Sequence, residues 1–265
     1  QDGQSWALLV SRGQNENWLS IPHATEELSG LKGRDRTELA AQILDKAGVD
    51  PSRIGPELLD LLDLVQGHPL AMQIALPMLK DVPLSALLAE LGKTLADLPD
   101  TAQEAGRDPY LTALMEYSWG RMSRRSRTHL PFLSMFQRRV MLDILNHMTS
   151  EQAYRTVMGE ELGWGACRTL LRSAQAAGFL ELVSPSVYQI HPALPWFYGR
   201  KLGQQAPAAR VGQLEQEYVR VYADTADYFM ESLYENQDAG VTAILAEEGN
   251  LTQALGLALE DQQWD

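Results

Sequence analysis

The sequence predicts a mainly α-helical fold: a helical lid bundle, a winged-helix domain with a small β-hairpin, and antiparallel helical repeats, preceded by the remnant of a strand. Apolar residues recur at helical spacing through most of the chain, which favours helices over strands. Two strand-like runs flank a turn at residues 184–186, which is typical of a small hairpin. Helical spacing returns after residue 213, which predicts a final set of paired helices.

The composition is that of a folded protein with a strong negative charge. Hydrophobic residues make up 45% and charged residues 22% of 265 residues, enough for two or three small units with their own cores. The net charge of −13 repels phosphate backbones and anionic lipid surfaces. We therefore expect neither nucleic acid nor a membrane as a partner.

The sequence favours a cytoplasmic location. The single cysteine, Cys167, cannot form an internal disulfide and is most simply a small buried apolar residue. No apolar run reaches the roughly 18 residues that a membrane helix needs, and the first residues lack a signal-peptide pattern. Neither end carries a starting or terminating signal, which suggests that both ends are cut.

The first third of the chain predicts one strand and four helices. The run Trp6-Ala-Leu-Leu-Val10 is short, apolar and followed by a polar loop, as expected for a buried strand whose neighbours are missing. Glycines and prolines then separate the helical segments. The predicted helices span residues 35–47, 56–65, 69–79 and 84–95. Their short connections predict a compact bundle.

A linker rich in Asp, Gly and Pro, from Pro99 to Pro109, separates this bundle from the next set of elements. The expected helices there span residues 111–122, 125–135, 141–146, 151–157 and 167–177. Strands at 178–183 and 187–190 follow, and helices that precede a small hairpin suggest a winged helix. A further helix starts at His191 and runs through Leu202.

The last part of the sequence predicts a polar linker and then paired helices. The linker spans residues 204–209, and a long helix carries Leu214 and Phe229 on its apolar face. Two shorter helices are expected at 243–246 and 251–259, separated by a break at Gly249-Asn250. This arrangement is typical of the start of a helical repeat array.

Motifs that would support catalysis are absent from the sequence. It contains no G-x-x-x-x-G-K-[ST] phosphate loop, no H-E-x-x-H, no paired cysteines and no G-x-S-x-G. We therefore predict no catalytic residues and no metal site.

Three local patterns each allow a binding role or a purely structural one. Arg12 follows the first strand, where it would either contact a terminal phosphate or remain solvated. Pro69 lies in Gly67-His-Pro-Leu-Ala71, where its ring would either lie against an adenine or only begin a helix. His191 ends a strand just before a helix, where it would either hold a phosphate or satisfy local hydrogen bonds.

In this order, the three patterns resemble the nucleotide-binding and winged-helix region of STAND signalling ATPases. The Val-Ser-Arg run ending at Arg12 is similar to the family's sensor strand, and Gly67-His-Pro-Leu-Ala71 is similar to its Gly-Leu-Pro-Leu-Ala motif. Ala177-Gly-Phe-Leu180 matches part of its winged-helix framework, and Ile190-His-Pro192 stands where Met-His-Asp is common. Asn250-Leu251 resembles the start of its tetratricopeptide-like repeats.

The resemblance implies a role for each of the three residues. Arg12 would sense the γ-phosphate, Pro69 would contact adenine, and His191 would hold the β-phosphate of bound ADP. Exchange for ATP would release the winged helix from the nucleotide-binding domain. The implied units are residues 1–20 as the remnant of a nucleotide-binding α/β domain, 21–104 as the lid, 105–204 as the winged helix, and 205–265 as the start of the repeats.

The departures from the family pattern limit what this chain can do alone. The phosphate loop and the acidic strand that holds magnesium are missing, so the fragment should not hydrolyse ATP and should carry no cofactor itself. ADP or ATP would be the cofactor of the full-length protein. The implied partners are the missing nucleotide-binding domain of the same chain and proteins that contact the C-terminal repeats. Pro192 replaces the usual aspartate after His191.

Two other functions remain open from the sequence. A winged-helix DNA-binding regulator is suggested by the helix at 167–177, which carries Arg168 and Arg172, and by arginines at 121, 124, 125, 127, 138 and 139. The net charge argues against it. A helical scaffold that binds a protein partner through residues 218–265 is compatible with the nucleotide-controlled switch.

Overall fold

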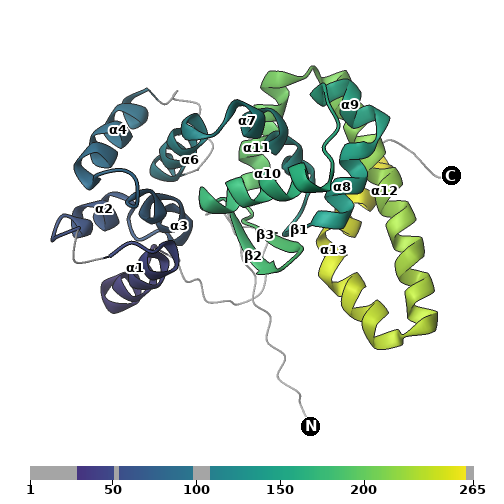
Figure 1. Cartoon of the computed structure of the whole chain (residues 1–265), viewed down its shortest axis with the longest axis horizontal. Coiled ribbons are helices and arrows are strands. Elements are labelled where there is room, and N and C mark those ends of the chain that lie inside the picture. The colour runs from purple at the N-terminus through teal and green to yellow at the C-terminus, as the bar shows by residue number, and fades with distance from the viewer. Residues whose placement is uncertain (1–28, 51–53, 98–107, 261–265) are drawn as a thin grey trace, which may run out of the picture.

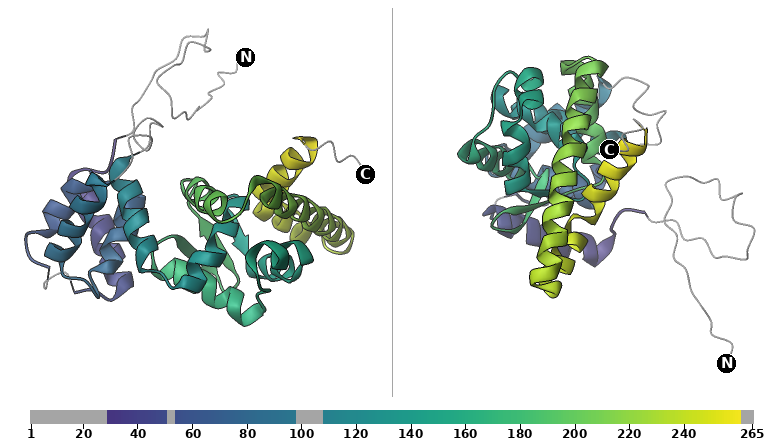
Figure 2. Two further views of the ribbon diagram at one scale, coloured as in Figure 1. Left: turned by 90° about the horizontal axis from the view of Figure 1, so that it is seen from above. Right: turned by 90° about the vertical axis from the view of Figure 1, so that its right-hand side faces the viewer.

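The computed structural model describes residues 29–50, 54–97 and 108–260, and within them the chain is mainly helical with one small sheet (Figure 1). The predicted fold class is confirmed. The predicted strand at residues 6–10 lies outside the described residues. In the left view of Figure 2, the central elements, from residue 124 to residue 205, lie between the helices of residues 33–96 and those of residues 208–260.

The N-terminal bundle contains the four predicted helices. They are α1 (Gly33–Ala47), α2 (Leu58–Leu64), α3 (Pro69–Met78) and α4 (Leu84–Ala96). Most of α3 is buried because its sequence is apolar on nearly every side, and it packs against α1. Helix α6 (Pro109–Arg121) also packs against α3 and α4, so it joins the bundle to the rest of the chain.

The central part has the element order expected for a winged helix. It comprises α7 (Arg124–His129), η2 (Leu130–Met135), β1 (Arg139–Met141), α8 (Leu142–Ser150), α9 (Gln152–Met158), α10 (Trp164–Ala176), β2 (Leu180–Ser184), β3 (Val187–Ile190) and α11 (Leu194–Gln205). The three strands form an antiparallel sheet in the order β1-β3-β2. The predicted hairpin is confirmed, and β1 adds a third strand that the sequence did not reveal.

The single helix expected over 125–135 is interrupted. It consists of α7 and the 3₁₀-helix η2, which begins at Leu130. Pro131 explains the change, because its ring lacks the N–H that would continue the α-helical hydrogen bonds.

The C-terminal part is one pair of long antiparallel helices, α12 (Ala208–Glu235) and α13 (Gln237–Glu260), which lie side by side in both views of Figure 2. Two predictions were wrong here. The linker at 204–209 is only Ala206-Pro207, because α11 continues to Gln205. The break at Gly249-Asn250 does not exist, because both residues lie inside α13 and the chain turns at Asn236 instead.

The buried apolar residues form a continuous core from α1 to α13. Helix α12 packs on α8 and α9, and α13 packs on β1. An aromatic group joins α6 to the sheet and α11: Trp119 meets Phe197 edge-on at 5.8 Å, and Phe179 lies 6.1 Å from Phe197. The C-terminal pair is therefore packed against the central part.

Candidate functional site

Pro69 begins α3, and its side chain is exposed. His68 caps the helix, because its Nδ1 accepts a hydrogen bond from the backbone N–H of Ala71 at 3.4 Å. Proline suits this first position, where a backbone N–H would have no partner within the helix. Capping therefore explains the local sequence, while the exposed ring leaves a flat apolar surface at the start of α3.

The turn before Pro69 is fixed by a close approach of two backbone segments. The N–H of Leu31 donates to the carbonyl oxygen of Gly67 at 2.9 Å. A Cβ on Gly67 would lie 2.1 Å from the Leu31 oxygen, and a Cβ on Gly30 would lie 1.9 Å from the Gln66 oxygen. Glycine is required at both positions by this contact, in addition to the φ of +65° at Gly67.

His191 directly follows β3 and is half-buried. Its Nδ1 accepts a hydrogen bond from the backbone N–H of Ala193 at 3.2 Å. In a neutral imidazole this leaves the proton on Nε2, which makes that nitrogen a hydrogen-bond donor. This hydrogen bond fixes the start of α11, which is the purely structural role that the sequence allowed for His191. It also makes Nε2 the nitrogen that can donate.

The N-terminal bundle meets the central part of the chain at the turn before β2. Gly178 has a φ of +75°, and a Cβ there would lie 2.3 Å from the Gln73 carbonyl oxygen of α3. Ser118 of α6 donates to the carbonyl oxygen of Ala177 at 3.5 Å. These contacts place two helices of the N-terminal part directly against one turn of the winged helix.

Pro69 and His191 belong to elements that meet at this turn. Gln73 follows Pro69 by four residues, which is about 6 Å along a helix axis. Leu180, two residues after Gly178, pairs with Ile190, and His191 is the next residue in the chain. Arg12 lies outside the described residues. The binding roles of these three residues stay predictions.

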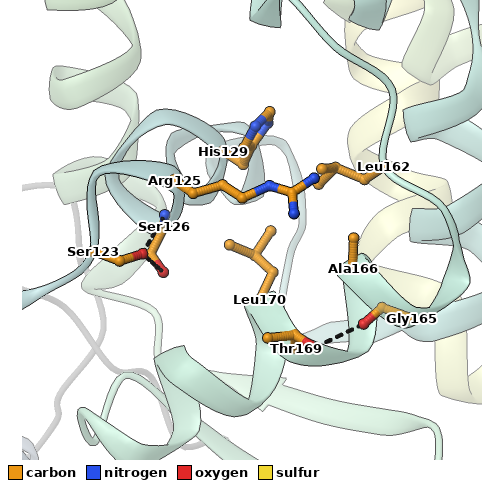
Figure 3. Close-up of a pocket in the computed structure, with 9 residues that line it drawn as sticks. All are labelled: Ser123, Arg125, Ser126, His129, Leu162, Gly165, Ala166, Thr169 and Leu170. Atoms are coloured by element: carbon orange, nitrogen blue, oxygen red, sulfur yellow. Dashed lines mark hydrogen bonds between the residues drawn. The ribbon is translucent and has the colours of Figure 1, made fainter.

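A pocket of about 310 Å³ lies elsewhere, between α7 and the first turns of α10 (Figure 3). The Arg125 side chain extends across it toward Leu162, and Leu170 lies beneath it (Figure 3). In the sequence, Arg125 stands out only as one of several arginines. No sequence motif marks this pocket, because its lining comes from two helices that are far apart in the chain.

The polar groups around this pocket are bonded to one another. Ser126 lies 3.1 Å from Ser173 through their hydroxyl oxygens, and Arg125 pairs with Glu160 at 3.1 Å. His129 is 2% exposed and lies 2.7 Å from the Tyr154 hydroxyl and 3.0 Å from a Glu160 carboxylate oxygen. Burial lowers the pKa of His129, although Glu160 opposes that shift. These bonds stabilise the fold and do not by themselves indicate a ligand.

The arginines that suggested DNA binding separate into two groups. Those at 121, 124, 125 and 127 lie on α6 and α7, whereas 138 and 139 lie at the start of β1. On α10, Arg168 and Arg172 are exposed. These two arginine side chains are few hydrogen-bond donors for a helix that would read a DNA groove. The net charge of −13 also opposes binding to DNA.

The described ranges contain no cluster of three or more His, Cys, Asp or Glu side chains that could hold a metal ion. Across the same ranges, none of the helices combines the length and apolar character needed to cross a bilayer.

The sequence matches no protein-family model, and neither a curated protein nor a solved structure is significantly similar to it.

Proposed function

We propose that this chain is the regulatory lid and winged-helix part of a nucleotide-controlled signalling switch of the STAND class. The single observation that carries the proposal is the contact at the Gly178 turn. It joins the helix that begins at Pro69 to the strand pair that ends at Ile190, just before His191. Two segments separated by more than 100 residues, which the family resemblance assigns to one nucleotide, therefore share one junction.

The chemistry at the two positions suits the two ends of ADP. The exposed ring of Pro69 offers a flat apolar surface for an adenine. The Nε2 of His191 donates when Nδ1 accepts from Ala193, so it suits a phosphate oxygen. A nucleotide in contact with both residues would hold the lid against the winged helix. Loss of one contact would shift the equilibrium toward the separated state.

In this proposal the chain regulates and does not catalyse. The residues that would bind and orient a triphosphate belong to a nucleotide-binding domain of the same protein, which is the principal partner. The chain is cytoplasmic, and its own affinity for ADP or ATP is weaker than about 1 mM, because it holds only the outer contacts.

The test uses the full-length protein that contains this chain. Its reading frame should encode a G-x-x-x-x-G-K-[ST] motif within roughly 150 residues upstream of Gln1. His191→Ala should weaken ADP binding about tenfold, the effect of one charge-assisted hydrogen bond. His147→Ala is the matched control, because His147 lies on α8 and pairs with Glu151 at 3.2 Å. A reading frame without the motif, or equal ADP affinity in both variants, would reject the switch.

A helical scaffold is the second candidate, favoured by an apolar stripe on α13. Val241, Leu245, Leu255 and Leu259 are all exposed, and their spacing places them on one side of the helix. Deleting the chain after Gln204 would not test this role cleanly, because Tyr218 of α12 packs edge-on against Phe136 at 5.7 Å. Leu245→Ser combined with Leu255→Ser should abolish partner capture without unfolding the protein. Capture that persists in this variant would remove the role from the stripe.

A further inference from the structure

A strained turn lies at the interface between the winged helix and α13. Arg138 has a φ of +63°, which is uncommon for a residue with a side chain. The N–H of Arg139 donates to the carbonyl oxygen of Gln137 at 2.7 Å, so the three residues form a γ-turn with positive φ. Such a backbone persists only where the surrounding structure holds it in place.

One side chain of α13 holds this turn from both sides. The Oδ1 of Asn250 accepts from the N–H of Gln137 at 2.6 Å, and its Nδ2 donates to the carbonyl oxygen of Arg139 at 3.0 Å. Asn250 is 1% exposed. Gly249 allows the turn to approach α13 closely, because a Cβ there would lie only 3.3 Å from the Gln137 carbonyl oxygen. The strained conformation of Arg138 is therefore imposed by a dedicated contact.

The turn leads into a small polar cavity of about 150 Å³ beside α13. The polar residues of its lining are Arg138, Arg139, Gln189 and Glu248. The other lining residues are Leu245, Ala246 and Gly249 of α13. Arg139 stands directly opposite Gln189 in the β1–β3 pairing, so their side chains project from the same face of the sheet. In Figure 1, β1 lies beside α13, as their contacts require.

The charges in this cavity favour an anion. Within the described ranges, neither Arg138 nor Arg139 forms a salt bridge, whereas Arg125, Arg155 and Arg200 each pair with a glutamate. Glu248 contributes one negative charge to the lining against the two guanidinium groups, and the buried Glu247 carboxyl beside the cavity also interacts with Arg139. At about 30 Å³ for each water, the cavity holds roughly five waters, which is room for a phosphate or carboxylate group.

We propose that this cavity binds an oxyanion, with the Arg138 and Arg139 guanidinium groups and the Gln189 amide as hydrogen-bond donors. Guanidinium groups match the geometry of phosphate and carboxylate oxygens. The strained turn brings Arg138 to the cavity, and Asn250 acts as a positioning residue because it holds that turn. The three donors lie on the sheet side of the cavity, and α13 forms the opposite wall. The proposal does not depend on nucleotide binding at the His191 junction.

The experiment titrates the chain of 265 residues with inorganic phosphate while sodium chloride keeps the ionic strength constant. Backbone amide NMR shifts of Arg139, Gln189 and Gly249 report the site, and thermal unfolding reports stability. We expect saturable shifts at these residues, with a Kd on the order of 1 mM. Phosphoserine and acetate are titrated in parallel. Tighter binding of phosphoserine assigns the site to a phosphorylated side chain, tighter acetate binding to a carboxylate, and equal or weaker binding of both to free phosphate.

Two variants and one control test the assignment. Arg139→Gln and Arg138→Gly should each weaken phosphate binding at least tenfold. Arg138→Gly should not lower the Tm, because glycine adopts positive φ without strain. Arg124→Gln removes an exposed arginine of α7 and should bind phosphate like the wild type. Absence of saturable shifts at about 20 mM phosphate, or equal binding by Arg138→Gly and the wild type, would overturn the proposal.

Discussion

Gly178 lies so close to Gln73 that no side chain fits between them. A Cβ on Gly178 would be 2.3 Å from the Gln73 carbonyl oxygen and 2.8 Å from the Cα of Ile74. The turn before β2 and helix α3 are therefore fitted to each other by their backbones. This contact places the N-terminal bundle against the central part of the chain, and the proposed switch depends on it.

Replacing Gly178 with alanine should separate the lid from the winged helix or destabilise the whole chain. The φ of +75° and the overlap with α3 both oppose a methyl group. We expect a loss of about 3 kcal/mol or more in the free energy of unfolding, measured by urea denaturation.

Gly159→Ala is the control for backbone strain alone. Gly159 has a φ of +88°, but a Cβ there would have no neighbour within 4 Å. Its loss should be about 1 kcal/mol. If both glycine variants lose the same free energy, the close contact between Gly178 and α3 is disproved.

Asn250→Ala should be strongly destabilising. It removes the hydrogen bonds to the partly buried backbone N–H of Gln137 and carbonyl of Arg139. We expect a loss of about 3 kcal/mol in the free energy of unfolding, together with NMR shift changes around Arg138. Thr252→Ala changes an exposed residue of the same helix and should alter stability by less than about 0.5 kcal/mol. Equal effects of the two variants would argue against the role of Asn250.

Glu247→Gln should stabilise the protein at neutral pH. Glu247 is fully buried, and its Oε2 accepts from the Tyr222 hydroxyl at 2.8 Å, whereas its Oε1 has no hydrogen-bond partner. Burial raises the pKa of Glu247, although Arg139 and the hydrogen bonds from Asn250 and Tyr222 oppose the shift. We expect a gain on the order of 1 kcal/mol for the neutral amide, measured by urea denaturation at about pH 8.

The pH dependence of this gain follows from the direction of the pKa shift. A carboxyl whose pKa is higher in the folded protein than in the unfolded chain favours the folded state when protonated. The contribution of Glu247 to stability is therefore present below the unfolded pKa of about 4.3 and is lost as the pH rises through the folded pKa. The advantage of Glu247→Gln should shrink toward zero near pH 4. A constant advantage at all pH values would contradict this explanation.

His129→Gln should weaken the pH dependence of stability on the acidic side. Burial lowers the pKa of His129 in the folded protein, so the unfolded chain binds the proton more readily. The stability that His129 contributes is full above the unfolded pKa of about 6.5 and is lost as the pH falls toward the folded pKa. Denaturation between about pH 8 and pH 5 should give a smaller slope for the variant. A slope for His129→Gln equal to that of the wild type would contradict this explanation.

The helices of the N-terminal bundle could be predicted because residues at their own ends determine where they begin and end. Gly48 ends α1 with a φ of +68°, and Pro69 begins α3 at a position where proline is favoured. The hairpin was equally visible, because apolar runs flank a short polar turn. These elements depend on neighbours within a few residues, which a single sequence contains.

The strand β1 and the continuity of α13 could not be predicted in this way. Residues 139–141 are too short to show alternation, and they form a strand only because they pair with β3. Gly249-Asn250 has the local signal of a break. Asn250 instead finds partners at Gln137 and Arg139, more than 100 residues away in the chain, and the packing of α13 on β1 outweighs the local preference.

The sequence by itself determined that the chain is mainly helical, where most helices begin and end, and that a small hairpin follows them. Only the tertiary structure decided which segments meet: α3 with the Gly178 turn, and α13 with the strained turn at Arg138. The physical reason is that helix periods and caps are local preferences. Close backbone contact and the pairing of buried polar groups depend on partners that the fold alone brings together.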